Sequence, residues 1–133
     1  LDVAGRGGTR FADIEIALNA NIRKTLSTDH VFDDWGYTTT ESLTAIKRAF
    51  PTINCWASGG IRNGLDVAKS MCLGARAVGV AGKLLRPATE STEAVVTVLR
   101  QFMSELRISC FGLGVSSSID LNRTHVLDET NAD

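Results

Sequence analysis

Short apolar segments alternate with longer amphipathic segments along the chain of 133 residues. Apolar runs bounded by glycine or polar residues predict strands, and apolar positions that recur every three to four residues predict helices. The expected strands are residues 1–3, 53–57 and 76–80. The expected helices are residues 11–26, 38–50, 64–73 and 91–107, with a short one near 116–122. Strands that alternate with helices are typical of βαβ units around a parallel sheet, so the expected fold class is α/β.

Capping residues mark the ends of two of these helices. Thr38 and Glu41 have the spacing of a capping box, in which each side chain binds a free backbone N–H at the helix start. Asn63 is a favourable N-cap for the next helix, which Gly74 is placed to stop. Pro51 closes the helix that Thr38 opens.

Two helices carry an apolar stripe, which is typical of a helix that buries one face. In the first helix the stripe is Phe11, Ile14, Leu18 and Ile22. In the last long helix it is Val95, Leu99, Phe102, Met103 and Leu106.

Composition narrows the class of protein. With 44% hydrophobic and 22% charged residues, the chain is typical of soluble globular proteins. A net charge of -1 gives no basic field for nucleic acid, and no apolar run approaches the roughly 20 residues that span a bilayer. Cys55, Cys72 and Cys110 form no Cys-x-x-Cys pair, which favours reduced, buried thiols and a cytoplasmic location.

Glycines stand where two of the strands give way to helices. Backbone N–H groups approach a phosphate closely when no Cβ intervenes, and a helix N-terminus adds partial positive charge. In (β/α)8 barrels the loops after the seventh and eighth strands often form such a site. The candidate residues are Gly59, Gly60, Ile61, Ala81 and Gly82. Arg62 either contacts the phosphate or pairs on a helix, and the alternative for the glycines is a purely structural turn.

The length predicts part of a barrel. A (β/α)8 barrel needs about 200 to 250 residues, and three parallel strands alone leave two sheet edges unpaired. We therefore expect the C-terminal half of a (β/α)8 TIM barrel, about strands six to eight with their helices. Residues 1–127 form this partial barrel, and residues 128–133 are expected to be a frayed tail. Trp56 belongs to the helix layer if it points outward and crowds the barrel if it points inward.

Three segments carry a resemblance to known families. Residues 57–69, ASGGIRNGLDVAK, are similar to a phosphate-site signature of FMN-dependent barrels and inosine-monophosphate dehydrogenases. Residues 2–11, DVAGRGGTRF, and residues 34–39, DWGYTT, resemble segments of the type 2 isopentenyl-diphosphate isomerases. The similarity runs in the family's order from Leu1 to about Leu121.

The resemblance implies an enzyme that interconverts isopentenyl and dimethylallyl diphosphate. It implies FMN as cofactor, with reduced FMN acting in allylic proton transfer, NADPH to reduce it, Mg2+, and a homo-oligomer. By family position Thr9 contacts the flavin; otherwise its hydroxyl only closes its own turn. The FMN phosphate is implied to lie at Gly59, Gly60, Ile61, Arg62, Ala81 and Gly82. The family's lysine, diphosphate-binding and Mg2+-binding residues lie upstream of Leu1, so catalytic residues are unknown and this chain alone is expected to be inactive.

Two alternatives remain open. An enzyme like inosine-monophosphate dehydrogenase requires a catalytic cysteine soon after the glycine-rich strand end, where this chain has none. A non-catalytic, phosphate-binding half-barrel explains the length directly. We expect His30 and His125 to be surface residues, Glu15 to lie on a helix face or in a salt bridge, and Trp35 to be a packing residue.

Overall fold

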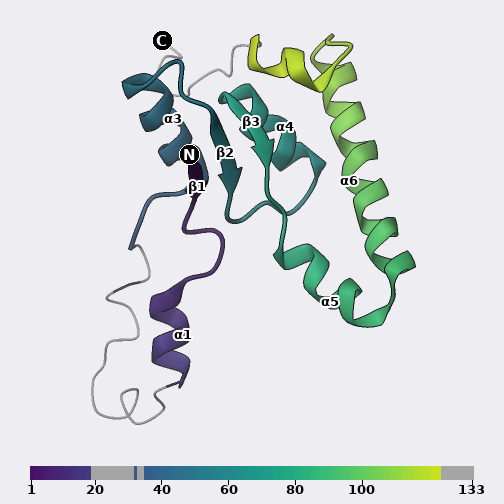
Figure 1. The fold of residues 1–133 in the computed structure, drawn as a ribbon. Coiled ribbons are helices and arrows are strands. Elements are labelled where there is room, and N and C mark those ends of the chain that lie inside the picture. The colour runs from purple at the N-terminus through teal and green to yellow at the C-terminus, as the bar shows by residue number, and fades with distance from the viewer. Residues whose placement is uncertain (19–31, 33–34, 124–133) are drawn as a thin grey trace.

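Three parallel strands form the only sheet among residues 1–18, 32 and 35–123, which the computed structural model describes. The strands are β1 (Asp2–Ala4), β2 (Cys55–Ser58) and β3 (Ala75–Val78), side by side in that order (Figure 1). Parallel strands need crossover connections, and each crossover here contains a helix. The expected α/β class is confirmed.

Helices cover one face of this sheet. The described helices are α1 (Phe11–Leu18), α3 (Thr39–Ala49), α4 (Gly64–Cys72), α5 (Gly82–Glu90), α6 (Thr92–Gly112) and the 3₁₀ helix η1 (Ser118–Arg123). The helix α3 packs on β1 and β2, α4 packs on β3, and α6 lies along α4 (Figure 1). None of the described helices is long and apolar enough to cross a membrane.

The expected caps are present. The Thr38 side chain accepts the backbone N–H of Glu41, and the Glu41 carboxylate accepts that of Thr38 at 2.7 Å, which completes the capping box of α3. Asn63 caps α4 by accepting the N–H of Asp66 at 2.8 Å. Gly74 follows α4 with φ of +94°, in the left-handed region that favours glycine.

The core has two parts. Between the sheet and α3 lie the buried residues Val3, Leu43, Cys55, Ala57 and Ala75. Where α4, α6 and η1 meet, the buried residues are Ala68, Cys110 and Leu121. All three cysteines are free thiols; Cys55 and Cys110 are buried as expected, and Cys72 is half-buried.

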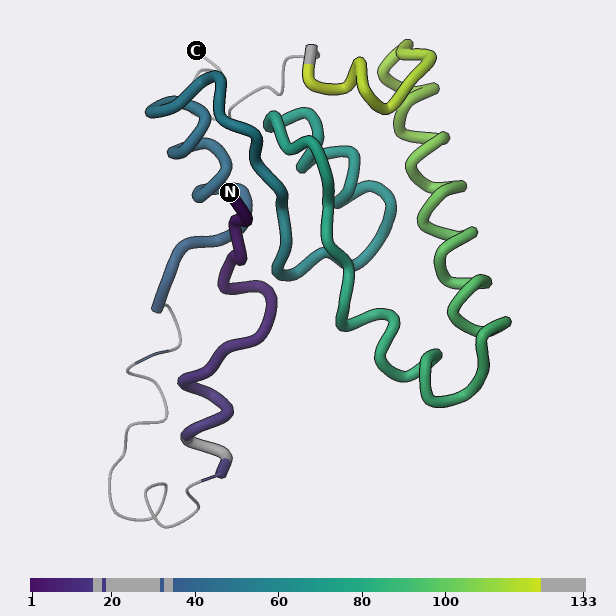
Figure 2. Tube along the Cα trace, viewed as in Figure 1, coloured from purple at the N-terminus to yellow at the C-terminus, as the bar shows by residue number. Residues whose placement is uncertain are grey.

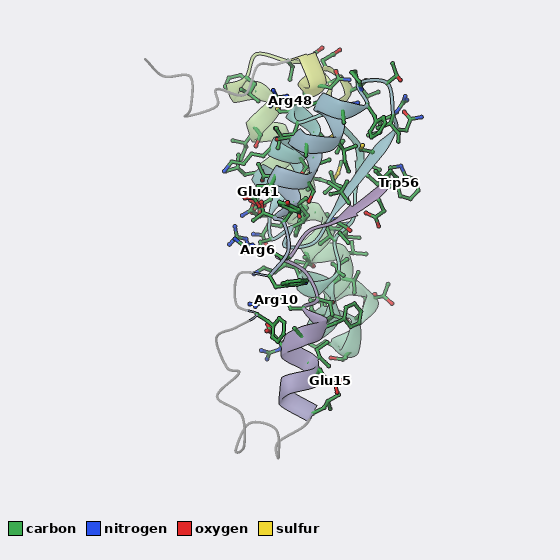
Figure 3. All side chains as sticks on the ribbon, turned by 90° about the vertical axis from the view of Figure 1, so that its left-hand side faces the viewer. Arg6, Arg10, Glu15, Glu41, Arg48 and Trp56 are labelled. Atoms are coloured by element: carbon green, nitrogen blue, oxygen red, sulfur yellow. The ribbon has the colours of Figure 1, made fainter. Side chains whose placement is uncertain are left out.

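The opposite face of the sheet carries Trp56. Side chains alternate along β2, so Cys55 and Ala57 enter the core while Trp56 points the other way and is 59% exposed. Figure 3 shows its ring projecting away from the side that carries Arg6 and Glu41. Trp56 therefore does not belong to the helix layer and lies on the face of the sheet opposite to it.

Two expectations about helices differ from the structure, and part of a third helix range cannot be compared with it. The helix α5 was not expected, because Pro87 lies within it and no side chain caps its start. The helix α1 is described only to Leu18, so residues 19–26 of the expected helix lie outside the described residues. Of its stripe, Phe11, Ile14 and Leu18 are exposed, with Phe11 at 80% and Leu18 at 75%, because α1 extends away from the sheet (Figure 2). The fourth residue, Ile22, lies outside the described residues.

The last long helix is longer than expected, and Trp35 is more exposed than expected. The helix α6 begins close to the expected start, with Ser91 as its N-cap, but continues to Gly112, and of its stripe only Phe102 is buried. Trp35 is 73% exposed and meets the ring of Phe32 edge-to-face, so it anchors no core. The two histidines, His30 and His125, and the tail at residues 128–133 lie outside the described residues.

Candidate functional site

The three loops that leave the strands meet at one end of the sheet. Carboxyl ends of parallel strands lie at the same edge, and the chain turns there after β1, β2 and β3 (Figure 2). The loops border an open cavity of about 940 Å³. All seven residues singled out in the sequence line this cavity: Thr9, Gly59, Gly60, Ile61, Arg62, Ala81 and Gly82.

Glycines let the first two loops pack backbone to backbone. Gly59 and Gly60 have φ of +90° and +78°, in the left-handed region. A Cβ on Gly60 would lie 2.9 Å from the Cα of Gly7, and a Cβ on Gly8 would lie 2.8 Å from the Cα of Gly59. These glycines are therefore needed for the packing of the two loops, and the same packing shapes one wall of the cavity.

A hydroxyl on α3 also binds the loop that follows β2. Thr39 Oγ1 lies 2.9 Å from the carbonyl oxygen of Ser58 and 2.6 Å from that of Gly59, and donates to this pair. The N–H of Gly5 also donates to Ser58, at 3.0 Å. Thr39 carries no sequence signal for this role, because its partners lie about 20 residues away in the chain.

The starts of α4 and α5 differ in their free N–H groups. At α4, Asn63 accepts from Asp66, and Glu105 accepts from Gly64 at 2.6 Å. At α5, no side chain caps the helix, and a Cβ on Gly82 would meet no atom within 4 Å. The first N–H groups of a helix need partners and carry partial positive charge. The open helix start therefore belongs to α5, at the cavity.

The loop after β2 also has free donors. Within the described part of the chain, the backbone N–H groups of Gly59, Gly60 and Ile61 donate to no other residue. The same is true of Gly82 and Lys83 across the cavity. Two sets of unpaired N–H groups thus border one cavity from opposite loops, an arrangement that suits an anion with several acceptor oxygens.

Arg62 and Lys83 add positive charge to the lining. Arg62 Nε lies 3.3 Å from the Asp66 carboxylate, and the Arg62 side chain is 73% exposed while it borders the cavity. Arg62 therefore pairs with Asp66 on α4 and also borders the cavity. Lys83, which the sequence analysis missed, lines the cavity at the start of α5. The hydroxyl of Thr9 makes no hydrogen bond with another described residue, so it does not close its own turn.

A family model of known proteins covers this region. Residues 33–128 match the model described as FMN-dependent dehydrogenase, which is more than half of the chain. The chain belongs to the FMN-dependent dehydrogenase family. The loops after β2 and β3 both lie within the matched residues, so the family's cofactor, FMN, agrees with a cavity whose N–H groups and cations suit an anion.

Individual relatives carry a more specific name. The isopentenyl-diphosphate delta-isomerase of Stutzerimonas stutzeri (strain A1501) is 40% identical over 127 residues, 96% of this chain and 36% of the relative. That of Pseudescherichia vulneris is 41% identical over 126 residues, covering 95% and 36%. That of Cronobacter sakazakii (strain ATCC BAA-894) is 43% identical over 117 residues, covering 88% and 33%. The chain spans about a third of the length of these curated relatives.

Cysteine and metal chemistry find no support at this cavity. None of Cys55, Cys72 and Cys110 lines it, although an enzyme like inosine-monophosphate dehydrogenase needs a cysteine there. Across the described residues, no three His, Cys, Asp or Glu side chains come together as metal ligands do. The polar groups that line the cavity are backbone N–H groups, the Thr9 hydroxyl and the cations Arg62 and Lys83.

Proposed function

We propose that this chain forms the FMN phosphate site of an isopentenyl-diphosphate isomerase, within the C-terminal half of a (β/α)8 barrel. The observation that carries the proposal is the convergence of seven residues from three loops on one cavity with unpaired N–H groups on two sides. The names of relatives that match 88% to 96% of the chain support the substrate, isopentenyl diphosphate. Loops after the last two strands of a barrel are a frequent phosphate site.

The residues present fit a phosphate group. A phosphate monoester carries close to two negative charges and three strong acceptor oxygens. Gly59, Gly60 and Ile61 offer N–H groups from the β2 loop, and Gly82 offers one from the open start of α5. A Cβ at Gly82 would stand in open space, so this glycine has no packing explanation. The missing side chain leaves the backbone at the start of α5 open to close approach by a ligand.

In this proposal the chain positions the cofactor. Reduced FMN supplies the acid and base for the allylic proton transfer, and the protein supplies binding, orientation and electrostatics. The loop N–H groups and Arg62 would hold the phosphate, and the Thr9 hydroxyl, in the β1 loop, would contact the flavin. NADPH, Mg2+ and the diphosphate would be held by residues other than these, in a cytoplasmic homo-oligomer.

The experiment compares FMN with riboflavin, which lacks only the phosphate, and uses the whole natural polypeptide that carries this sequence. We expect FMN to bind at least about tenfold more tightly, or about 1.4 kcal/mol, in a titration of flavin fluorescence. We also expect conversion of isopentenyl to dimethylallyl diphosphate when FMN, a reductant and Mg2+ are supplied. Equal affinity for the two flavins would contradict the phosphate site, and absence of turnover would contradict the isomerase.

A second candidate is a non-catalytic half-barrel that binds phosphate and associates with another half. The uncovered sheet face around Trp56 favours it, because an exposed sheet face needs a covering layer. This candidate predicts the same preference for FMN but no turnover, so the two measurements together separate it from the isomerase.

A further inference from the structure

The start of α4 is held by a carboxylate from another helix. Glu105 lies on α6, and its Oε2 accepts the backbone N–H of Gly64, the first residue of α4, at 2.6 Å. Its other oxygen, Oε1, accepts a hydrogen bond from Gln101 at 2.8 Å. The Gly64 N–H, and to a lesser degree Gln101, lowers the pKa of Glu105 below its ordinary range. The contact is therefore a charge-assisted hydrogen bond at neutral pH.

Gly64 makes this contact possible. It is buried, and a Cβ there would lie 2.6 Å from the Cβ of Glu105 and 2.6 Å from the backbone N of Leu106. The missing side chain lets the backbones of α4 and α6 approach closely, which brings the carboxylate within reach of the helix start. The two partners are separated by 41 residues in the chain.

The loop at residues 59–62 lies between this contact and β2. On the strand side, Thr39 Oγ1 lies 2.6 Å from the carbonyl oxygen of Gly59. On the helix side, Glu105 and Asn63 hold the first turn of α4. Because glycine adopts many backbone conformations, a loop with two adjacent glycines takes its shape from its contacts, which are the backbone of Gly7 and Gly8 and the anchors at its two ends. The direction of the loop N–H groups therefore depends on α6 as well as on the sheet.

We propose that Glu105 is a positioning residue that orients the loop at residues 59–62 toward the phosphate. Glu105 does not line the cavity, so it acts through the loop and not on the ligand. Its carboxylate also occupies the positive end of α4, which leaves the loop and the start of α5 to hold the anion. The inference rests on the proposed phosphate site.

The test measures affinities for FMN and riboflavin in the whole natural polypeptide by titration of flavin fluorescence. Glu105→Ala should lose about tenfold in FMN affinity, since it removes a charge-assisted hydrogen bond, while riboflavin affinity stays within about twofold. Glu105→Gln keeps an acceptor for Gly64 and should retain most of the preference for FMN. Gln101→Ala, the matched control, removes only the second hydrogen bond and should bind as the wild type does.

The Glu105 variants distinguish a positioning role from a purely structural one. An equal loss for both flavins in Glu105→Ala would mean that Glu105 only stabilises the fold, and an undiminished preference would mean that the loop does not need it; either overturns the inference. If Glu105→Ala does not fold, Glu105→Asp replaces it, because the shorter side chain withdraws the carboxylate from Gly64 and should reduce the preference in the same direction. A wild type that prefers neither flavin contradicts the proposed function itself.

Discussion

At the start of α5, Gly82 lies outside the left-handed region, and a Cβ there would meet no atom within 4 Å. Alanine is better than glycine inside a helix by about 0.5 to 1 kcal/mol, so Gly82→Ala should leave the free energy of unfolding unchanged or raise it. The same methyl adds bulk to the cavity lining where the phosphate approaches. We expect FMN affinity to fall about tenfold, or about 1.4 kcal/mol, in a fluorescence titration.

Gly112 provides the matched control for this change. It is the last residue of α6, it too has open space around a Cβ, and it does not line the cavity. Gly112→Ala should leave flavin affinity unchanged. If both variants weaken FMN binding alike, or neither does, the start of α5 is not part of the site.

The residues that the sequence identified all lie in loops that follow a strand; Thr9 was identified by the resemblance, and the others by their place in two glycine-containing loops. Glycines at the ends of strands are visible in the sequence, and the structure brings all seven candidates to one cavity. Thr39 and Glu105 were missed because each acts on a distant segment, 20 and 41 residues away. A single threonine or glutamate on a helix carries no mark of such a partner.

Among the elements, α3 has a capping box whose strength depends on pH. The backbone N–H of Thr38, and then its hydroxyl, lower the pKa of Glu41 below its ordinary value near 4.5. A carboxyl with a lowered pKa stabilises the folded state above its unfolded pKa and loses that effect as pH falls through its folded pKa. Glu41→Gln should therefore speed amide hydrogen exchange in the first turn of α3 at neutral pH, and the difference from wild type should vanish in acid.

The control for this prediction is Glu93→Gln. Glu93 is also an acidic residue in the first turn of a helix, α6, whose cap is Ser91. Its replacement changes net charge equally and should leave exchange in α3 unaffected. A difference between Glu41→Gln and wild type that persists at the lowest pH would show that ionisation of Glu41 is not the cause.

Elements with a local signal were predicted well, and those without one were not. The helices α3 and α4 begin at their expected caps because Thr38 and Asn63 bind N–H groups within their own first turns, and α6 begins close to its expected start, where Ser91 does the same. The helix α5 has no such cap and contains Pro87, a residue that usually interrupts helices. The periodicity of α1 predicted a helix that the structure shows over Phe11–Leu18, but burial of its stripe depends on a partner that no local pattern reveals.

For the whole molecule, the alternation of strands and helices was sufficient to predict a parallel α/β sheet. The activity of the isolated 133 residues is a separate question at this scale. The described residues form a cavity suited to a phosphate but contain no cluster of metal ligands. We expect the isolated chain with FMN, reductant and Mg2+ to show no isomerase turnover above background, with the Stutzerimonas stutzeri relative as the positive control. Turnover by the isolated chain would contradict this prediction.

The uncovered face of the sheet makes a second prediction about the isolated chain. Trp56 is 59% exposed on that face, between Asp2 of β1 and Ala77 of β3. Association of two copies through this face would remove apolar surface from water. In a Trp35→Phe background, where Trp56 is the one remaining tryptophan, its emission should move to shorter wavelength as concentration rises, together with the sedimenting mass. Trp56→Ser should weaken that association, whereas Phe111→Ser, which removes an aromatic ring that is 88% exposed on α6, should not. A rise in mass without a shift in Trp56 emission would place the contact on another face, and would leave the sheet to be covered by a segment other than a second copy.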